Sequence, residues 1–387
     1  MNGVQDNQSS PTIKSQAKCL PGQIVLVLQG GGALGSYQAG VYQALHEAGI
    51  EPDWIIGTSI GAINASLIAG NAPQDRLARL KEFWKRMEQN PVWKFHDIFP
   101  GFNERLSYWS TITHGIPGFF KPNALAHAGD AYPLGAERAG YYSTAPLEAT
   151  LSELVDFDLV NRCKPRLTVG AAHVRSSEMR YFDSRDCALG LKHIMASGAL
   201  PPAFPAVRIE GELYWDGGIL SNTPTEAVFD DNPRKDSLIF SVHLWNPNGA
   251  EPVTMAEVLN RHKDVQYSSR IASHIVRQQQ AHRLRHVINQ LAARLPEAER
   301  NDPAIRELTG YGCQTRMHVV RLLAPQLERE SHTKDIDFSP AGIMQRWDAG
   351  YAHTKSVLER TPWVGEFDSL SGVILHEQME LMPQAAE

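Results

Sequence analysis

Two strand–turn–helix units near the start of the chain limit its possible folds more than any other feature of the sequence. The apolar run at residues 24–28 predicts a strand that is buried on both faces, and a glycine turn follows it at residues 30–35. The pattern returns at residues 53–57, which lead into a second glycine turn and a predicted helix at residues 59–69. Because strands that alternate with helices form parallel sheets, we expect an α/β protein with both turns at the carboxyl edge of one sheet.

The whole chain divides by composition into three parts, one of which contains an insertion. Residues 1–22 are polar, and we expect them to be disordered, whereas residues 23–249 contain the predicted strands of a mainly parallel sheet. Within this core, residues 93–142 hold 11 of the 32 aromatic residues, interrupted by Gly and Pro. This insertion either covers an apolar pocket as a lid or fills a satellite core. Residues 250–387 have mainly helical patterns and are interpreted as a C-terminal extension.

Composition and charge exclude several classes of function. The chain has 387 residues with 37 Lys and Arg against 43 Asp and Glu, and its net charge of −6 gives no overall attraction for nucleic acid. Four dispersed cysteines predict reduced thiols, and the sequence contains no HExxH motif, carboxylate-rich calcium loop or Cys/His cluster, so we expect no metal and no other cofactor. The polar N-terminus lacks the apolar stretch of a secretory signal, which favours a cytoplasmic protein or one peripheral to a membrane.

The first glycine turn satisfies the pattern GxGxxG and reads Gly30-Gly31-Gly32-Ala33-Leu34-Gly35. Glycines at the start of a helix leave backbone N–H groups that bind an anion, either a phosphate or a transient oxyanion. A dinucleotide-binding fold would place an acidic residue at the carboxyl end of the second strand. The candidate acid, Asp53, stands before that strand, so the pattern favours an oxyanion site over a dinucleotide site.

The second turn has the form GxSxG and reads Gly57-Thr58-Ser59-Ile60-Gly61. Small residues around a serine permit the sharp strand-to-helix bend that exposes a nucleophilic hydroxyl. A serine in front of a helix is also a common N-cap, which is the structural alternative for Ser59. The nucleophile is favoured because the first glycine turn supplies N–H donors at the same edge of the sheet.

A nucleophilic serine needs a base, and the sequence favours Asp216 over any histidine. Asp216 ends a predicted strand at residues 212–215 and is followed by Gly217-Gly218, which permit close approach to another backbone segment. By contrast, His173 and His243 lie within predicted strands. The pattern indicates a Ser59–Asp216 dyad, although Asp-Gly-Gly is also common as an ordinary turn.

These three motifs, in this order, resemble those of the patatin-like phospholipases, and the resemblance covers residues 23–244. It implies a three-layer α/β/α acyl hydrolase domain that cleaves lipid esters, with Ser59 as nucleophile, Asp216 as base and the glycine turn at residues 30–35 as oxyanion hole. Many members of the family carry Arg or Lys within that turn, where this chain has Leu34. The segment after residue 250 is outside the patatin core and resembles an extension of a bacterial subgroup.

The sequence therefore predicts a lipid acyl hydrolase of the phospholipase A or lysophospholipase type. One alternative is an esterase for another hydrophobic ester, such as a hydroxyalkanoate oligomer or polymer. A second is a non-catalytic protein that binds a nucleotide or a membrane surface. The segment 261–285 has six Lys and Arg against one Asp, which is typical of peripheral contact with an anionic membrane, of a solvated helix face or of a subunit contact.

Overall fold

The computed structural model of this protein describes residues 20–89, 111, 113–127, 132–268, 271–327 and 330–377. The prediction of disorder for the first 19 residues lies outside the described residues. So does most of the first half of the aromatic insertion, up to residue 110.

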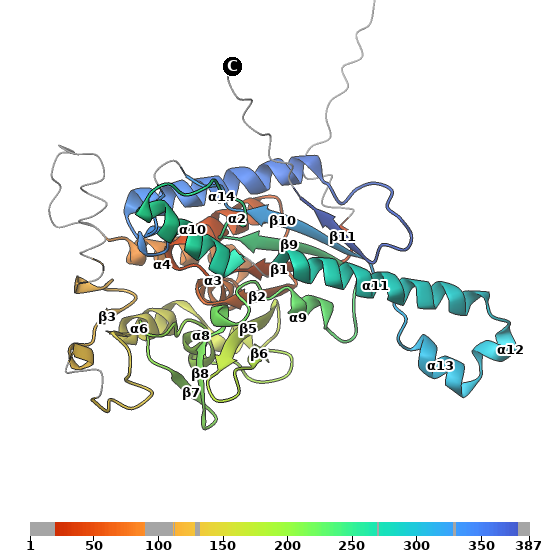
Figure 1. The fold of residues 1–387 in the computed structure, drawn as a ribbon, viewed down its shortest axis with the longest axis horizontal. Coiled ribbons are helices and arrows are strands. Elements are labelled where there is room, and N and C mark those ends of the chain that lie inside the picture. The colour runs from red at the N-terminus through yellow and green to blue at the C-terminus, as the bar shows by residue number, and fades with distance from the viewer. Residues whose placement is uncertain are drawn as a thin grey trace, which may run out of the picture.

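A mixed central sheet organises the described chain (Figure 1). Its strand order is β11-β10-β9-β1-β2-β5-β8-β7, and β6 also pairs with β5. Pairs from β11 across to β5 are parallel, whereas those that involve β6 or β8 are antiparallel. The predicted mainly parallel α/β fold is confirmed. The strands of this sheet are β1 (Gln23–Leu28), β2 (Trp54–Thr58), β5 (Arg166–His173), β6 (Met179–Asp183), β7 (Val207–Ile209), β8 (Glu212–Asp216), β9 (Ser237–His243), β10 (Met317–Leu323) and β11 (Val373–His376).

Both faces of the sheet are buried, as the continuous apolar run of β1 predicts. Alternate side chains of β1 point to opposite faces, so Leu26 and Leu28 join one hydrophobic cluster and Val25 and Val27 join another. On the first face the helices are α2 (Ser36–Glu47), α3 (Ile60–Ala69), α4 (Pro73–Met87), α6 (Ala145–Leu154), α8 (Leu191–Ser197) and α14 (Pro340–Arg360). On the second face lie α9 (Glu226–Phe229) and α11 (Ile271–Arg294), where the Phe229 ring contacts His282. This arrangement confirms three layers.

The segment after residue 250 is mainly helical, as expected, but it is not outside the core. Strands β10 and β11 continue the sheet beyond β9, and α14 packs along α2, where Trp347 Nε1 donates a 2.7 Å hydrogen bond to Gln43 (Figure 1). These elements are therefore part of the central sheet and of its helical layer, which the description of the segment as an extension did not predict. Its other helices are α10 (Met255–Ser268), α12 (Glu297–Arg300) and α13 (Pro303–Thr309).

Helix α11 projects from the body of the molecule and carries α12 and α13 at its far end (Figure 1). Within the described chain, no helix combines the length and apolar character that are needed to cross a bilayer. The remaining short elements are α7 (Phe157–Val160), the small hairpin of β3 (Lys121–Pro122) and β4 (Tyr142–Ser143), and four 3₁₀ helices. These are η1 (Gly32–Gly35), η2 (Ala124–His127), η3 (Gly217–Ile219) and η4 (Lys334–Ile336).

Candidate active site

Ser59 occupies the sharp turn between β2 and α3. Its φ of +56° and ψ of −127° are a strained combination for a residue with a side chain. The turn requires glycine at its edge, because a Cβ atom on Gly61 would lie 2.2 Å from the carbonyl oxygen of Leu28. Although Ser59 stands at the N-cap position of α3, its hydroxyl makes no capping hydrogen bond. The N-cap alternative therefore does not describe this side chain.

The register of three strands brings Asp216 beside Ser59. Strand β5 lies between β2 and β8, where Thr58 pairs with Gly170 and the adjacent Ala171 pairs with Asp216. The ends of β2 and β8 are thus separated by the width of one strand. The Ser59 hydroxyl interacts with the Asp216 carboxylate, and this interaction favours the ionised form of the acid. The structure brings together the two predicted residues across 157 positions of sequence.

The Asp216 carboxylate is buried, with 2% of the residue exposed. Burial removes water from the charged form and raises the pKa of Asp216 to about 7, against the opposing effect of hydrogen bonds from Ser59 and from the Gly218 amide. The Gly218 N–H lies 2.7 Å from Oδ1 of Asp216. A carboxylate with this pKa is a far better proton acceptor near neutral pH than an exposed aspartate.

Only the first three residues of the glycine turn, Gly30, Gly31 and Gly32, line the cavity that contains Ser59. The amide of Gly30 donates to the Asn222 carbonyl at 3.1 Å, so it is not available to an oxyanion. Gly31 and Gly32 begin η1, and their amides have no backbone acceptor among the described residues. The predicted oxyanion site therefore narrows to two N–H groups.

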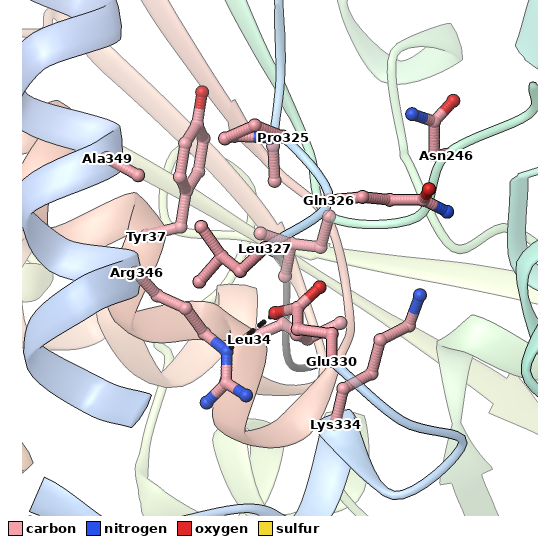
Figure 2. Close-up of a pocket in the computed structure, with 12 residues that line it drawn as sticks. Leu34, Tyr37, Asn246, Pro325, Gln326, Leu327, Glu330, Lys334, Arg346 and Ala349 are labelled. Carbon is pink, nitrogen blue, oxygen red and sulfur yellow. Dashed lines mark hydrogen bonds and ion pairs between the residues drawn. The ribbon is translucent and has the colours of Figure 1, made fainter. Parts of the chain in front are cut away.

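The last three residues of the same turn have other surroundings. Ala33 and Gly35 are buried away from the Ser59 cavity. Leu34 borders a separate, small pocket together with Glu330, Lys334 and Arg346 (Figure 2). In that pocket Arg346 Nε donates to the Glu330 carboxylate at 3.1 Å. These three residues are not part of the described lining of the Ser59 cavity, and the oxyanion role predicted for them stays a prediction.

The cavity beside Ser59 has a volume of about 210 Å³ and a mostly apolar lining. One wall is a group of rings from segments that are far apart in sequence, with adjacent ring centres 4.9–6.4 Å apart. These rings are Phe119, Phe120, Tyr142, Phe204 and Phe338. Three of them come from the aromatic insertion, so its described part lines the pocket, as one of the two alternatives predicted. Whether the insertion moves as a lid stays a prediction.

Several residues that the sequence analysis did not identify hold the turns around Gly30 and Ser59 in place. Asn222 Nδ2 and Trp245 Nε1 both donate to the Gly30 carbonyl, at 3.1 and 2.8 Å. Ser197 Oγ accepts the Ser59 amide at 3.0 Å and donates to the Gly170 carbonyl at 2.6 Å. Asn222, Trp245 and Ser197 are single residues outside any motif. The one available sequence signal is that Asn222 and Trp245 follow the ends of predicted strands.

The described lining of the cavity contains no histidine. His243 is buried in β9, where its Nε2 lies 2.9 Å from Ser241 Oγ. Burial, followed by the nearby charge of Arg321, lowers the pKa of His243 to about 3. His173 lies at the end of β5 and pairs with Glu212 at 3.2 Å. Neither ring is placed to act on Ser59.

The chain is similar to known proteins of the patatin-like phospholipase family. A family model described as patatin-like phospholipase matches residues 26–229, and a second, described as patatin phospholipase, matches residues 265–370. Lysophospholipase nte1 of Aspergillus terreus is 29% identical over 260 residues, and that of Aspergillus oryzae is 47% identical over 261 residues. Each match covers 61% of this chain but 14% of the fungal protein, so the chain spans a small part of these relatives. VipD from Legionella pneumophila is 16% identical, with a TM-score of 0.37 over 88% of this chain and 67% of VipD.

Proposed function

This chain belongs to the patatin-like phospholipase family, and on that premise we propose that it hydrolyses the carboxylic esters of phospholipids or lysophospholipids. In this proposal Ser59 is the nucleophile and Asp216 is its general base. The observation that carries the proposal is a strained serine whose hydroxyl makes no capping hydrogen bond and interacts with a buried aspartate at an apolar cavity.

In the acylation step, Ser59 Oγ attacks the ester carbonyl while Asp216 accepts its proton. The Oγ–carbonyl carbon bond forms, the carbonyl becomes a tetrahedral oxyanion, and collapse expels the alcohol, which receives the proton from Asp216. General base catalysis of this kind contributes about 10²–10⁴-fold to the rate. The raised pKa of Asp216 supports this role because the proton moves to a base of useful strength.

The amides of Gly31 and Gly32 are the candidates for binding the oxyanion, because they are the first N–H groups of η1 and lie at the cavity wall. Removal of one such donor costs about 10²–10³-fold in comparable hydrolases. The start of α3 directly after Ser59 adds a favourable potential for the developing negative charge. In the second half of the reaction, Asp216 takes a proton from water as the water oxygen attacks the acyl carbon. The bond from that carbon to Ser59 Oγ then breaks, Asp216 returns the proton to Oγ, and the fatty acid is released.

The lining of the cavity supports an acyl chain as the bound group. The aromatic wall offers apolar surface for a hydrocarbon, and the described lining includes neither Lys nor Arg that would hold a nucleotide phosphate. The membrane-associated location and the contact with anionic lipid that the sequence predicts remain predictions.

The test is covalent labelling followed by product analysis. The protein is treated with a fluorophosphonate probe and its intact mass is measured, and fatty acid release is measured from lysophospholipids, phospholipids and hydroxybutyrate oligomers. We expect one label on the wild type and release from the lipids, with both lost in Ser59→Ala by about 10⁶-fold in rate.

Ser152→Ala is the matched control, because Ser152 is exposed on α6 and far from the cavity lining. It should retain labelling and release. Near-wild-type labelling or turnover by folded Ser59→Ala would remove the basis of the mechanism. Release from the oligomers without release from any lipid would assign the site to the alternative esterase.

A further inference from the structure

The cavity beside Ser59 has two chemically different halves. The aromatic wall described above faces the acyl chain in the proposed reaction. The remaining lining gathers around the glycine turn and is more polar, with Asn222, Trp245, Tyr267 and Asp335. Because a hydrocarbon chain favours the aromatic wall, the alcohol part of an ester at Ser59 is directed toward this polar half.

Asp335 is fixed at the polar half by both its backbone and its side chain. Its carbonyl oxygen packs so closely on Gly32 that a Cβ atom on this glycine would lie 2.2 Å away. Its carboxylate pairs with Lys263 of α10, with Nζ 2.6 Å from Oδ1. Asp335 lines the cavity and Lys263 is not part of its described lining, so Asp335 is the member of the ion pair that borders the cavity.

The charge of Asp335 affects the pKa of Tyr267, another residue of the polar half. The ring of this tyrosine packs at a tilt of 33° against Trp245, with centres 4.9 Å apart, and both residues line the polar half. Burial raises the pKa of the Tyr267 phenol, and the negative charges of Asp335 and then Asp216 raise it further. Both carboxylates therefore act on the same part of the cavity.

No described residue of the lining supplies a compensating cation. Asp216 and Asp335 are the charged members of the described lining. Lys334, which adjoins Asp335 in the chain, lines the separate pocket of Leu34 (Figure 2) and pairs with the buried Asp264 at 2.7 Å, with its ammonium 5.4 Å from the centre of the Trp245 ring. A net negative group on the alcohol part of a substrate would thus meet negative charge in a partly desolvated space.

We propose that the Lys263–Asp335 pair determines substrate specificity by the net charge of the alcohol part of the ester, favouring uncharged or zwitterionic alcohol parts over net-anionic ones. This inference rests on the proposed lipid hydrolase function and names the class of substrate. Asp335 supplies the repulsion for an anion inside the cavity. Lys263 reduces that repulsion by its pairing with the carboxylate.

The experiment compares three oleoyl esters that differ only in the alcohol part: monooleoylglycerol, lysophosphatidylcholine and lysophosphatidylglycerol. The measured quantity is the ratio of kcat/KM for the anionic lysophosphatidylglycerol to that for uncharged monooleoylglycerol. We expect Asp335→Asn to raise this ratio and Lys263→Met to lower it, each by about 3- to 10-fold at low salt. The ratio for zwitterionic lysophosphatidylcholine should change less in both variants.

The two substitutions are expected to change the kcat/KM ratio in opposite directions, which distinguishes a charge effect from a structural effect. Both substitutions break the same ion pair, so a purely structural role would change the ratio in the same direction, or not at all. The double variant should lie between the two single variants. Equal ratios in all four proteins would overturn the inference while leaving the proposed function intact. A wild type that releases oleate from none of the three esters would instead overturn the proposed function.

Discussion

Replacement of Asp216 by asparagine should abolish catalysis and stabilise the protein at the same time. Asparagine has nearly the same shape and keeps an oxygen that accepts the Gly218 amide, but it cannot take a proton from Ser59. We expect kcat/KM to fall by about 10²–10⁴-fold. The stability effect follows from the burial of the carboxylate, and its size and sign depend on pH.

The pKa of Asp216 is 3.8 in its ordinary state and about 7 in the folded protein. Between these values the unfolded chain has lost the proton and the folded chain has kept it, so the free energy of unfolding falls as pH rises and is level above about pH 7. The full difference corresponds to about 4 kcal/mol, at 1.36 kcal/mol for each pKa unit. Asp216→Asn, which does not ionise, should be more stable than wild type by about 2 kcal/mol at pH 5 and about 4 kcal/mol at pH 8.

Urea unfolding followed by tryptophan fluorescence, at half-unit steps between pH 5 and pH 8, measures this difference. In parallel, log kcat/KM of the wild type should rise with unit slope below about pH 7 and then level off, because the base must be ionised. Parallel stability curves for wild type and Asp216→Asn would refute the reasoning, since they would mean that the carboxylate is not desolvated. Full activity of the wild type at pH 5 would refute it independently.

Two further expectations concern residues outside the dyad. Single substitution of His173, His193 or His243 by glutamine should leave fluorophosphonate labelling of Ser59 intact, because none of these rings lines the cavity, and loss of labelling in a folded variant would indicate a triad. Helix α11 has four arginines, no acidic residue, and exposed leucines, so the protein should co-sediment with vesicles that contain phosphatidylglycerol and less with pure phosphatidylcholine. Arg277→Gln with Arg294→Gln should weaken that binding, and binding that ignores anionic lipid would contradict the expectation.

Local patterns were sufficient to predict the elements that carry the chemistry. The apolar run of β1 and the turn around Ser59 are short-range features, because strand burial and the glycine requirement of a sharp bend depend on neighbouring residues. Further along the chain, the apolar run at residues 317–323 predicts a strand and the pattern at residues 340–358 predicts a helix, and the structure has β10 and α14 at these positions.

The parts that could not be predicted depend on contacts between distant segments. Ser197 supports Ser59 across 138 positions, and Trp245 supports Gly30 across 215, without any spacing that links them. The pairing of β10 with β9 depends on contacts between segments that are distant in sequence, and a local sequence pattern does not contain that information. For the same reason the glycine turn looked like a six-residue site, although η1 directs only its first residues to the cavity.

The chemistry proposed for Asp216 depends on the segment after residue 250 as much as on the three motifs. A pKa near 7 requires that water be excluded from the carboxylate, and Tyr267, Asp335 and Phe338 of this segment line the same cavity as Asp216. Strand β10 also pairs along the whole of β9, every residue of which is buried. Without β10, β9 would be an edge strand with exposed backbone groups. The turn that follows β9, in which Trp245 donates a hydrogen bond to the Gly30 carbonyl, would then lose the support of a paired strand. The catalytic motifs are therefore necessary but not sufficient for the proposed base, because the desolvation that raises the pKa of Asp216 is supplied partly from the other end of the chain.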